Sequence, residues 1–385
     1  MSNVVFLGLI SFFADISAEM VYPIIPLYLT SSFGATPAMV GLIEGIAESL
    51  ASLLKVFSGY ITDKYQKKKP IAFVGYATGI IYKAALLFAQ SWTGILGARV
   101  IDRIGKGIRT APRDVMISDS SQDRHGGTAF GIHKALDMAG SALGILIAYL
   151  ILKSSNGIYD YKQIFVVSII PAALSLLMFF KIKEKKEERF VQERRPFWKN
   201  VKEVDNQLKL YLFIAFLFTL GNSSNAFLLL KAKSIGFDDT TVILLYFIYS
   251  ITASILAVPA GNRSDIAGRK KLLVAGYIIF ALVYFGFAFV NNKRFMIVLF
   301  VLYGVYTAMT AGVERAYISE ISPKELKGTM LGLHATVTGI ALLPASAIAG
   351  LLWNSFGARA PFIFGSSLSL AAAFTLINFM NEVKH

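Results

Sequence analysis

Long apolar stretches alternate with short polar segments along almost the whole chain. A helix needs about 20 mostly apolar residues to span a bilayer, and these stretches are of that length. Their apolar residues are continuous rather than alternating with a period of two, which favours helices over strands. We therefore predict an all-α membrane protein with twelve transmembrane helices. The predicted ranges are 4–29, 38–61, 70–89, 92–117, 128–152, 162–180, 208–230, 239–261, 272–290, 295–317, 328–352 and 360–380.

The composition supports this prediction and excludes other classes of protein. Of the 385 residues, 55% are hydrophobic and only 16% are charged, whereas soluble domains carry about 25% charged residues. The absence of cysteine excludes disulfide scaffolds, Cys-ligated metal sites and cysteine nucleophiles. The sequence also contains no recognisable Ser–His–Asp or metal-ligand pattern. We therefore predict that the protein is not an enzyme, holds no metal and needs no cofactor.

The net charge of +14 indicates topology rather than a nucleic-acid partner. Acidic and basic residues nearly balance inside the apolar stretches, so the excess positive charge lies in the loops. A nucleic-acid-binding protein would concentrate basic residues on one folded face, and no nucleic acid is expected as a partner. Most loop lysines and arginines follow even-numbered helices. The positive-inside rule therefore predicts a multi-pass protein of the cytoplasmic (inner) membrane with both termini in the cytoplasm.

One long hydrophilic segment lies near the middle of the chain. Residues 183–207 are rich in both acidic and basic side chains, which is typical of a solvated tether. We predict that this segment is a cytoplasmic linker between an N-terminal six-helix bundle, residues 1–182, and a C-terminal six-helix bundle, residues 208–385.

An internal repeat supports this division. Gly75-Tyr76 recurs as Gly276-Tyr277, an offset of 201 residues (276 − 75), and residues 127–133 resemble residues 328–334 at the same offset. A parallel repeat of six-helix halves is typical of secondary transporters, which bind substrate near the middle of the membrane between the halves.

A motif that occurs once in each half resembles the hallmark of the major facilitator superfamily. That hallmark, between the second and third helices, is Gly-x-x-x-Asp-(Arg/Lys)-x-Gly-(Arg/Lys)-(Arg/Lys). The first copy here has Gln66 in place of the second Gly, and the second copy has Ile266 after the acid. The resemblance covers essentially the whole chain and implies the major facilitator fold, two pseudo-symmetric six-helix bundles, in a monomeric protein. It also implies a conformational latch formed by Gly59, Asp63, Lys64, Gly261, Asp265 and Arg269.

Two further segments resemble signatures of proton-linked members of that superfamily. Arg99 begins a segment similar to the helix-4 motif Arg-x-x-Gln-Gly, with Asp102 and Arg103 in place of the Gln and the Gly. The segment from Gly140 to Gly144 resembles the helix-5 antiporter signature Gly-x-x-x-Gly-Pro, without the Pro. These resemblances point to the drug:proton antiporter-like branch.

Ionisable residues inside the apolar stretches are the candidate functional groups. A charge at the bilayer centre costs roughly 2.5–3.5 kcal/mol, so these side chains are expected to face a hydrated cavity or one another. All but two, Glu314 and Arg315, lie in the first half. A carboxyl group that alternates between dry and hydrated surroundings can bind and release a proton. The candidate proton-coupling residues are Asp15, Asp102, Asp137 and Glu19, with Asp15 first because it resembles the helix-1 acid of drug:proton antiporters.

Polar and aromatic residues near these acids are the candidate lining of a substrate cavity. In the second half, Asn225 aligns with Glu19 and would give uncharged polar lining. The complete predicted set is Glu19, Tyr22, Arg99, Arg103, Lys106, Asn222 and Asn225.

Other buried ionisable residues have simpler explanations. Glu44, Glu48 and Lys55 can pair with one another or with a neighbouring helix. Lys83 is expected to extend towards the membrane surface. His334 matches His133 through the repeat, and packing or capping explains this pair as well as proton relay does.

The sequence thus predicts a secondary active transporter that works by alternating access, with proton-coupled export of a small organic compound as the leading interpretation. The proton gradient would be its energy source, and its partners would be the substrate, protons and the lipid bilayer. Proton-coupled uptake of an organic anion and lipid flipping are open alternatives. In a different class, the protein would be a membrane receptor or sensor that does not transport.

Overall fold

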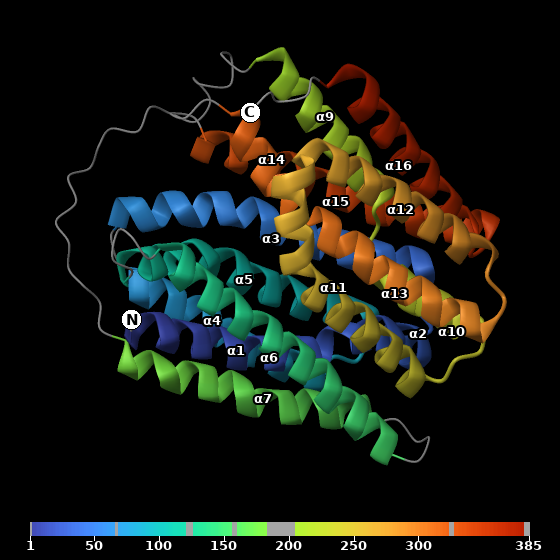
Figure 1. Cartoon of the computed structure of the whole chain (residues 1–385). Helices are drawn as coiled ribbons and strands as arrows, with labels where there is room; N and C mark the ends of the chain where they lie inside the picture. The colour runs from blue at the N-terminus through green and yellow to red at the C-terminus, as the bar shows by residue number, and fades with distance from the viewer. Residues whose placement is uncertain are drawn as a thin grey trace. The chain divides into compact units, whose positions relative to one another are not determined.

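The chain is helical throughout the part that the structure, a computed structural model, describes: residues 2–65, 68–120, 126–155, 160–182, 205–322 and 327–380. Each of the twelve predicted ranges corresponds to one helix or to a pair of shorter helices, so the predicted fold class is confirmed (Figure 1). Within these residues, eleven helical segments are long and apolar enough to cross a membrane. The remaining predicted range, 92–117, falls on α5 (Trp92–Ser120), which carries many charges.

Each helix of the second half begins and ends a nearly constant number of residues after its counterpart in the first half. α4 (Lys68–Phe88) and α12 (Arg269–Phe289) both contain 21 residues and begin and end 201 residues apart. α5 has the same relation to the consecutive helices α13 (Lys293–Thr310) and α14 (Val313–Ile321). The internal repeat seen in the motifs therefore extends to the secondary structure.

Two predicted spans, 4–29 and 208–230, are interrupted at matching positions, although each remains one membrane-length segment. α1 (Ser2–Val21) is followed by a short 3-10 helix, Tyr22–Ile24, and then by α2 (Ile25–Phe33). α9 (Asn206–Gly221) is separated from α10 (Ala226–Ser234) by residues 222–225. Pro23 lacks a backbone N–H, and the Asn and Ser side chains of residues 222–225 compete for backbone hydrogen bonds. A third interruption, Ala311–Gly312, separates α13 from α14.

The described helices cluster into two compact units. Unit 1 contains Met1–Ala35, Ile46–Phe190 and Asp238–Phe247, and unit 2 contains Thr36–Gly45, Val191–Phe237 and Ile248–His385. The first residues of α3 (Pro37–Tyr65) thus belong to unit 2, and the rest of that helix belongs to unit 1. The first residues of α11 (Asp239–Ala267) belong to unit 1, and the rest of that helix belongs to unit 2. Most of the predicted linker lies outside the described residues, and the domain boundaries remain a prediction.

In unit 1, α1 packs between α6 (Gly126–Ser154) and α7 (Tyr161–Met178), and α4 packs along α5 (Figure 1). Glycines permit the closest approach. A Cβ atom on Gly75 would lie only 2.8 Å from the carbonyl oxygen of Gly105. Larger residues at such contacts would force α4 and α5 apart.

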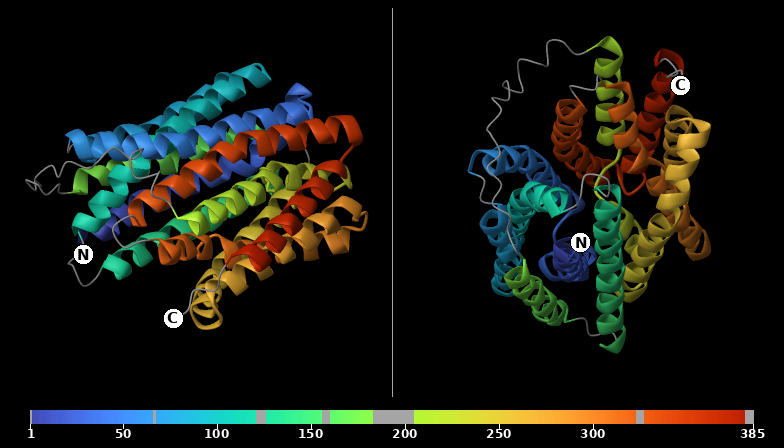
Figure 2. Two further views of the ribbon diagram at one scale, coloured as in Figure 1. Left: turned by 90° about the horizontal axis from the view of Figure 1, so that it is seen from above. Right: turned by 60° about the vertical axis from the view of Figure 1, so that its left-hand side comes forward.

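In unit 2, α12 packs against α13 and α16 (Ala360–Phe379), and α9 packs against α16 and α15 (Lys327–Phe356) (Figure 2). A Cβ atom on Gly221 would lie 3.0 Å from the carbonyl oxygen of Gly365, which again places two helix backbones in contact.

Candidate functional site

The structure brings together two of the predicted proton-coupling acids, Asp15 on α1 and Asp137 on α6. Their carboxyl groups lie within hydrogen-bonding reach of each other. Two glycines one turn apart on α6 make this possible. A Cβ atom on Gly140 would collide with the carbonyl oxygen of Phe12, and one on Gly144 would lie 2.5 Å from the carbonyl oxygen of Ile16. The Gly-x-x-x-Gly segment is therefore a helix-packing device that sets the distance between the two acids.

The surroundings of the two carboxyl groups differ. Lys134 donates to Asp137 at 2.9 Å, and its side chain is largely exposed. Asp15 forms no ion pair with any described residue. Two adjacent carboxyl groups do not both carry a negative charge readily, and such pairs share a proton. Asp15 and Asp137 are therefore adjacent acids of which only Asp137 has an ion-pair partner among the described residues.

A second cluster of predicted residues forms a network of salt bridges. Arg103 of α5 contacts Glu48 of α3 at 3.1 Å, and Asp102 at 3.5 Å. Arg99 lies 3.7 Å from Asp102. The guanidinium groups of Arg99 and Arg103 lie over the ring of Tyr22, 5.4 and 5.8 Å from its centroid. Glu48 therefore pairs across to another helix, and Asp102 is an ion-pair partner in this conformation.

Two other predicted residues lie beside this network without joining it. Glu19 is within electrostatic range of Lys106 and Arg103 but forms no salt bridge with a described residue. Lys106 is exposed, although it lies in the middle of α5. The structure thus places Glu19 and Lys106 near the network as opposite charges that form no salt bridge with a described residue.

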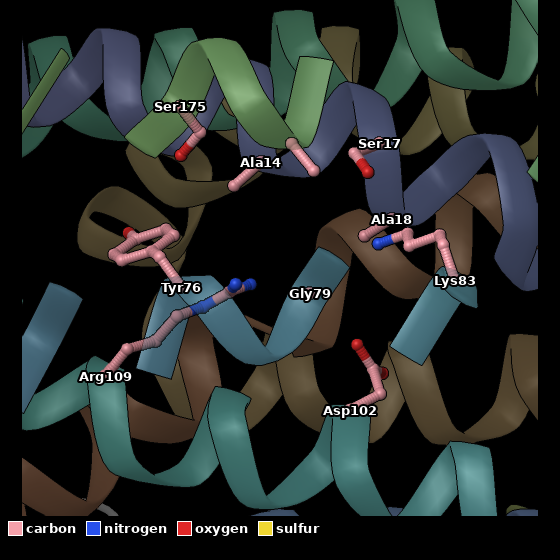
Figure 3. A pocket seen from close by; sticks show the side chains of 10 residues that line it. Ala14, Ser17, Ala18, Tyr76, Gly79, Lys83, Asp102, Arg109 and Ser175 are labelled. Carbon is pink, nitrogen blue, oxygen red and sulfur yellow. The ribbon is translucent and has the colours of Figure 1, made fainter. Parts of the chain in front are cut away.

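A polar pocket lies inside unit 1 between α1, α4, α5 and α7 (Figure 3). Lys83, Asp102 and Arg109 extend into it, together with Tyr76 and Ser175. It is large enough for about one water molecule. Lys83 is only 2% exposed. The expectation that Lys83 extends to the membrane surface is wrong, because its stem is held within the helix bundle and its ammonium group faces this pocket.

The asparagines predicted in the second half lie in the interruption between α9 and α10. Asn222 Nδ2 donates to the hydroxyl of Tyr306 at 2.7 Å, and the hydroxyl of Tyr303 donates to Asn225 Oδ1 at 2.8 Å. The ring of Tyr249 packs 5.0 Å from that of Tyr303. Asn225 lies in the interruption itself and not on a helical face like that of Glu19, so the alignment of these two residues was wrong.

The sequence alone leaves two roles open for Tyr249, Tyr303 and Tyr306, aromatic contacts in a cavity or packing in the core, and the repeat contains a further signal. At the offset of 201, Tyr303 occupies the position of Asp102, and Tyr284 occupies the position of Lys83. The ring centroids of Tyr284 and Tyr303 are 6.3 Å apart. Positions that hold charges in the first half therefore hold aromatic hydroxyl groups in the second half.

Only the second copy of the predicted latch is described completely. Arg269 binds Asp265 at 3.1 Å and Glu320 of α14 at 3.0 Å. A Cβ atom on Gly261 would meet nothing within 4 Å, so close packing does not account for this glycine here. In the first copy, the backbone of Gly59, Asp63 and Lys64 belongs to α3, but their side chains lie outside the described residues.

Within the described residues, two repeats of membrane-length helices are interrupted at matching positions, and charged side chains in unit 1 and tyrosines in unit 2 pack between these helices. This arrangement is typical of a membrane transport protein. The Major Facilitator Superfamily matches the chain over residues 7–230 and 211–384. An uncharacterised MFS-type transporter of Methanocaldococcus jannaschii is 36% identical over 381 residues, which cover 97% of this chain and 94% of the relative. The chain therefore belongs to the Major Facilitator Superfamily.

More distant proteins share the fold. The multidrug resistance protein MdtH of Photorhabdus laumondii is 21% identical over 350 residues, or 87% of this chain and 82% of MdtH. The solved structure of the nucleoside transporter NupG has a TM-score of 0.80 and 12% identity, with 98% of each chain covered. At these identities the likeness extends to the fold and not to the substrate.

Proposed function

We propose that this protein is a proton-coupled exporter of a small organic compound that works by alternating access. The observation that carries the proposal is the contact between Asp15 and Asp137. A shared proton is released when the two carboxyl groups separate or when water or substrate reaches them. Both acids lie on helices whose close packing depends on two glycines, so a small relative movement of α1 and α6 changes the affinity of the site for protons.

Export is the direction that the sequence favours. The segment from Gly140 to Gly144 resembles an antiporter signature, and the similar protein MdtH is named a multidrug resistance protein. In the proposed cycle, substrate from the cytoplasm displaces the proton from Asp15 and Asp137. A proton from the other side of the membrane then rebinds and resets the carrier.

The test begins with a thermal-shift screen of the purified protein against drugs, nucleosides, sugars and other metabolites. The protein is then reconstituted into proteoliposomes. Uptake of a compound that stabilised it is measured under a pH gradient of either direction. The proposal predicts that the compound accumulates in the vesicles against its own concentration gradient only when protons flow out of them. Accumulation that is independent of the pH gradient would refute proton coupling.

The same vesicles test the site. Asp15→Asn is expected to bind the compound but to lose transport driven by the pH gradient, because the pair can no longer exchange its proton. Asp160→Asn is the matched control, since Asp160 is the exposed N-cap of α7 and asparagine caps a helix equally well. Full gradient-driven transport by Asp15→Asn would show that the proton is carried elsewhere.

One observation favours a second candidate function, proton-coupled uptake of an organic anion. Arg99 and Arg103 lie side by side over Tyr22 and pair with Asp102 and Glu48, and a carboxylate or phosphate of a substrate that displaced one of these acids would find two guanidinium donors. Uptake would require protons and substrate to move in the same direction, so the direction of the productive pH gradient separates the two functions.

A further inference from the structure

Two positive side chains, which we call the pocket cations, extend into the polar pocket of unit 1 without an acidic partner. They are Lys83 of α4 and Arg109 of α5 (Figure 3). Within the described residues, neither forms a salt bridge, and no group accepts a hydrogen bond from either of them. The guanidinium group of Arg109 lies over the ring of Tyr76, 4.4 Å from its centroid. A buried cation without a counter-charge is costly, so the pocket cations call for a partner.

The other polar groups of the pocket are engaged elsewhere. The carboxylate of Asp102 lies 3.7 Å from Arg99 and 3.5 Å from Arg103, so two guanidinium groups already balance its charge. The hydroxyl groups of Ser17 and Ser175 donate to backbone carbonyls of neighbouring helices at 2.6 and 2.9 Å. The pocket therefore holds ammonium and guanidinium donors that no acid in the described part of the chain neutralises.

The second half fills the matching position with aromatic rings. At the offset of 201, Gly79 corresponds to Phe280 and Lys83 corresponds to Tyr284. The rings of Phe280 and Tyr284 stack with their centroids 4.0 Å apart. In unit 1, a Cβ atom on Gly79 would lie 3.8 Å from Lys83 Nζ, so the ammonium group lies beside a position that has no side chain. The same pair of positions thus leaves space next to a charge in unit 1 and is filled by stacked rings in unit 2.

We propose that this pocket binds one small inorganic anion, chloride or another halide, between Lys83 and Arg109. Both side chains are hydrogen-bond donors only, and charge-assisted hydrogen bonds to an anion are stronger than those to water. The pocket has room for about one water molecule, which suits an ion of a single atom and excludes phosphate, sulfate and organic acids. The anion is a counter-ion of unit 1 and not the transported compound, so the inference goes beyond the proposed function.

Thermal unfolding of the purified full-length protein tests this site without substrate or a pH gradient. Chloride is titrated into a gluconate buffer at constant ionic strength, because gluconate is too large for the pocket. The wild type should show a saturable rise of a few degrees in its unfolding temperature, since the anion binds the folded state. Lys83→Met should lose this rise. Lys162→Met is the matched control and should keep the rise, because Lys162 is an exposed lysine of the same unit.

A lost response to chloride is separable from a loss of folding. Lys83→Met removes a buried charge without a partner, so it is expected to be at least as stable as the wild type in gluconate. If this variant does not fold, Arg109→Gln replaces it and should lose the rise as well.

Two outcomes would overturn the proposal. Equal unfolding temperatures of the wild type in chloride and in gluconate would show that the pocket holds only water. A chloride response of Lys83→Met equal to that of the wild type would show that chloride acts elsewhere. Neither measurement depends on transport, so failure of this inference and failure of the proposed proton coupling are distinguishable.

Discussion

Replacement of Gly144 by alanine tests whether helix packing controls the acid pair. A Cβ atom at this position would lie 2.5 Å from the carbonyl oxygen of Ile16, whereas ordinary van der Waals contact begins at 3.4 Å. Because the obstacle is backbone, α1 and α6 must separate by about 0.9 Å (3.4 − 2.5). A hydrogen bond between two carboxyl groups spans about 2.5–3.0 Å, so we expect a displacement of this size to weaken the contact between Asp15 and Asp137.

Both stability and coupling should change by predictable amounts. Overpacking of this kind costs about 1–3 kcal/mol, which thermal unfolding in detergent or nanodiscs can measure. Loss of a hydrogen bond to a charged group, about 1.5–3 kcal/mol, corresponds to a reduction of about tenfold or more in gradient-driven transport. Transport driven by the compound's own gradient should fall much less, because the fold is retained.

Gly97→Ala is the matched control for this prediction. Gly97 is an exposed residue of α5, and a Cβ atom there would meet nothing within 4 Å. Alanine in an open helical position stabilises by about 0.5–1 kcal/mol relative to glycine. If Gly144→Ala and Gly97→Ala have the same unfolding temperature and the same proton-coupled rate, the packing of α1 on α6 does not position the acids.

Three further predictions follow from contacts within the two units. Glu48→Gln should lower the free energy of unfolding by about 1.5–3 kcal/mol, since it leaves Arg103 without its 3.1 Å partner; a double-mutant cycle with Arg103→Gln should show coupling, and strict additivity would contradict the pairing. Lys83→Met should stabilise the protein by about 1–4 kcal/mol, because the buried ammonium has no salt-bridge partner among the described residues, and a lower unfolding temperature would count against this. Gly268→Ala should cost about 1–3 kcal/mol because φ is +94° there, while Gly312→Ala, at φ −88° and in open space, should be nearly neutral; equal effects would remove the strain argument.

The membrane fold could be predicted from the sequence because its signals are long and redundant. Twelve apolar runs, each about as long as a bilayer is thick, leave few alternatives, and the repeated motifs gave the pairing of helices between the halves. Pro23 and Pro26 predict a bend in the first helix, where the interruption Tyr22–Ile24 lies, but hydropathy gives no sign of the interruption at residues 222–225 because it averages over a window. A Pro or a few polar residues within an apolar run change this average little, although they remove or redirect backbone hydrogen bonds.

The partners of the charged residues could be predicted only in part. Helical spacing places Asp15 and Glu19 on one face, but it does not say which neighbouring helix that face meets. The contact with Asp137 depends on glycines of α6 whose packing role is visible only in three dimensions. Lys83 shows the opposite error, since a lysine near the end of an apolar run extends to the surface in many helices but here turns into a pocket.

Tyrosines in the second half occupy positions that hold charged residues in the first half. This difference has a consequence for how the substrate specificity of such a protein can change. The two halves repeat one helical scaffold with different side chains at matching positions. Under the proposed function, changes to Tyr284, Tyr303 or Asn225, the amide partner of Tyr303, alter what the second copy recognises and leave Asp15 and Asp137 untouched. If the proposed proton coupling holds, new specificities can arise, or be engineered, without changing the acid pair that carries it.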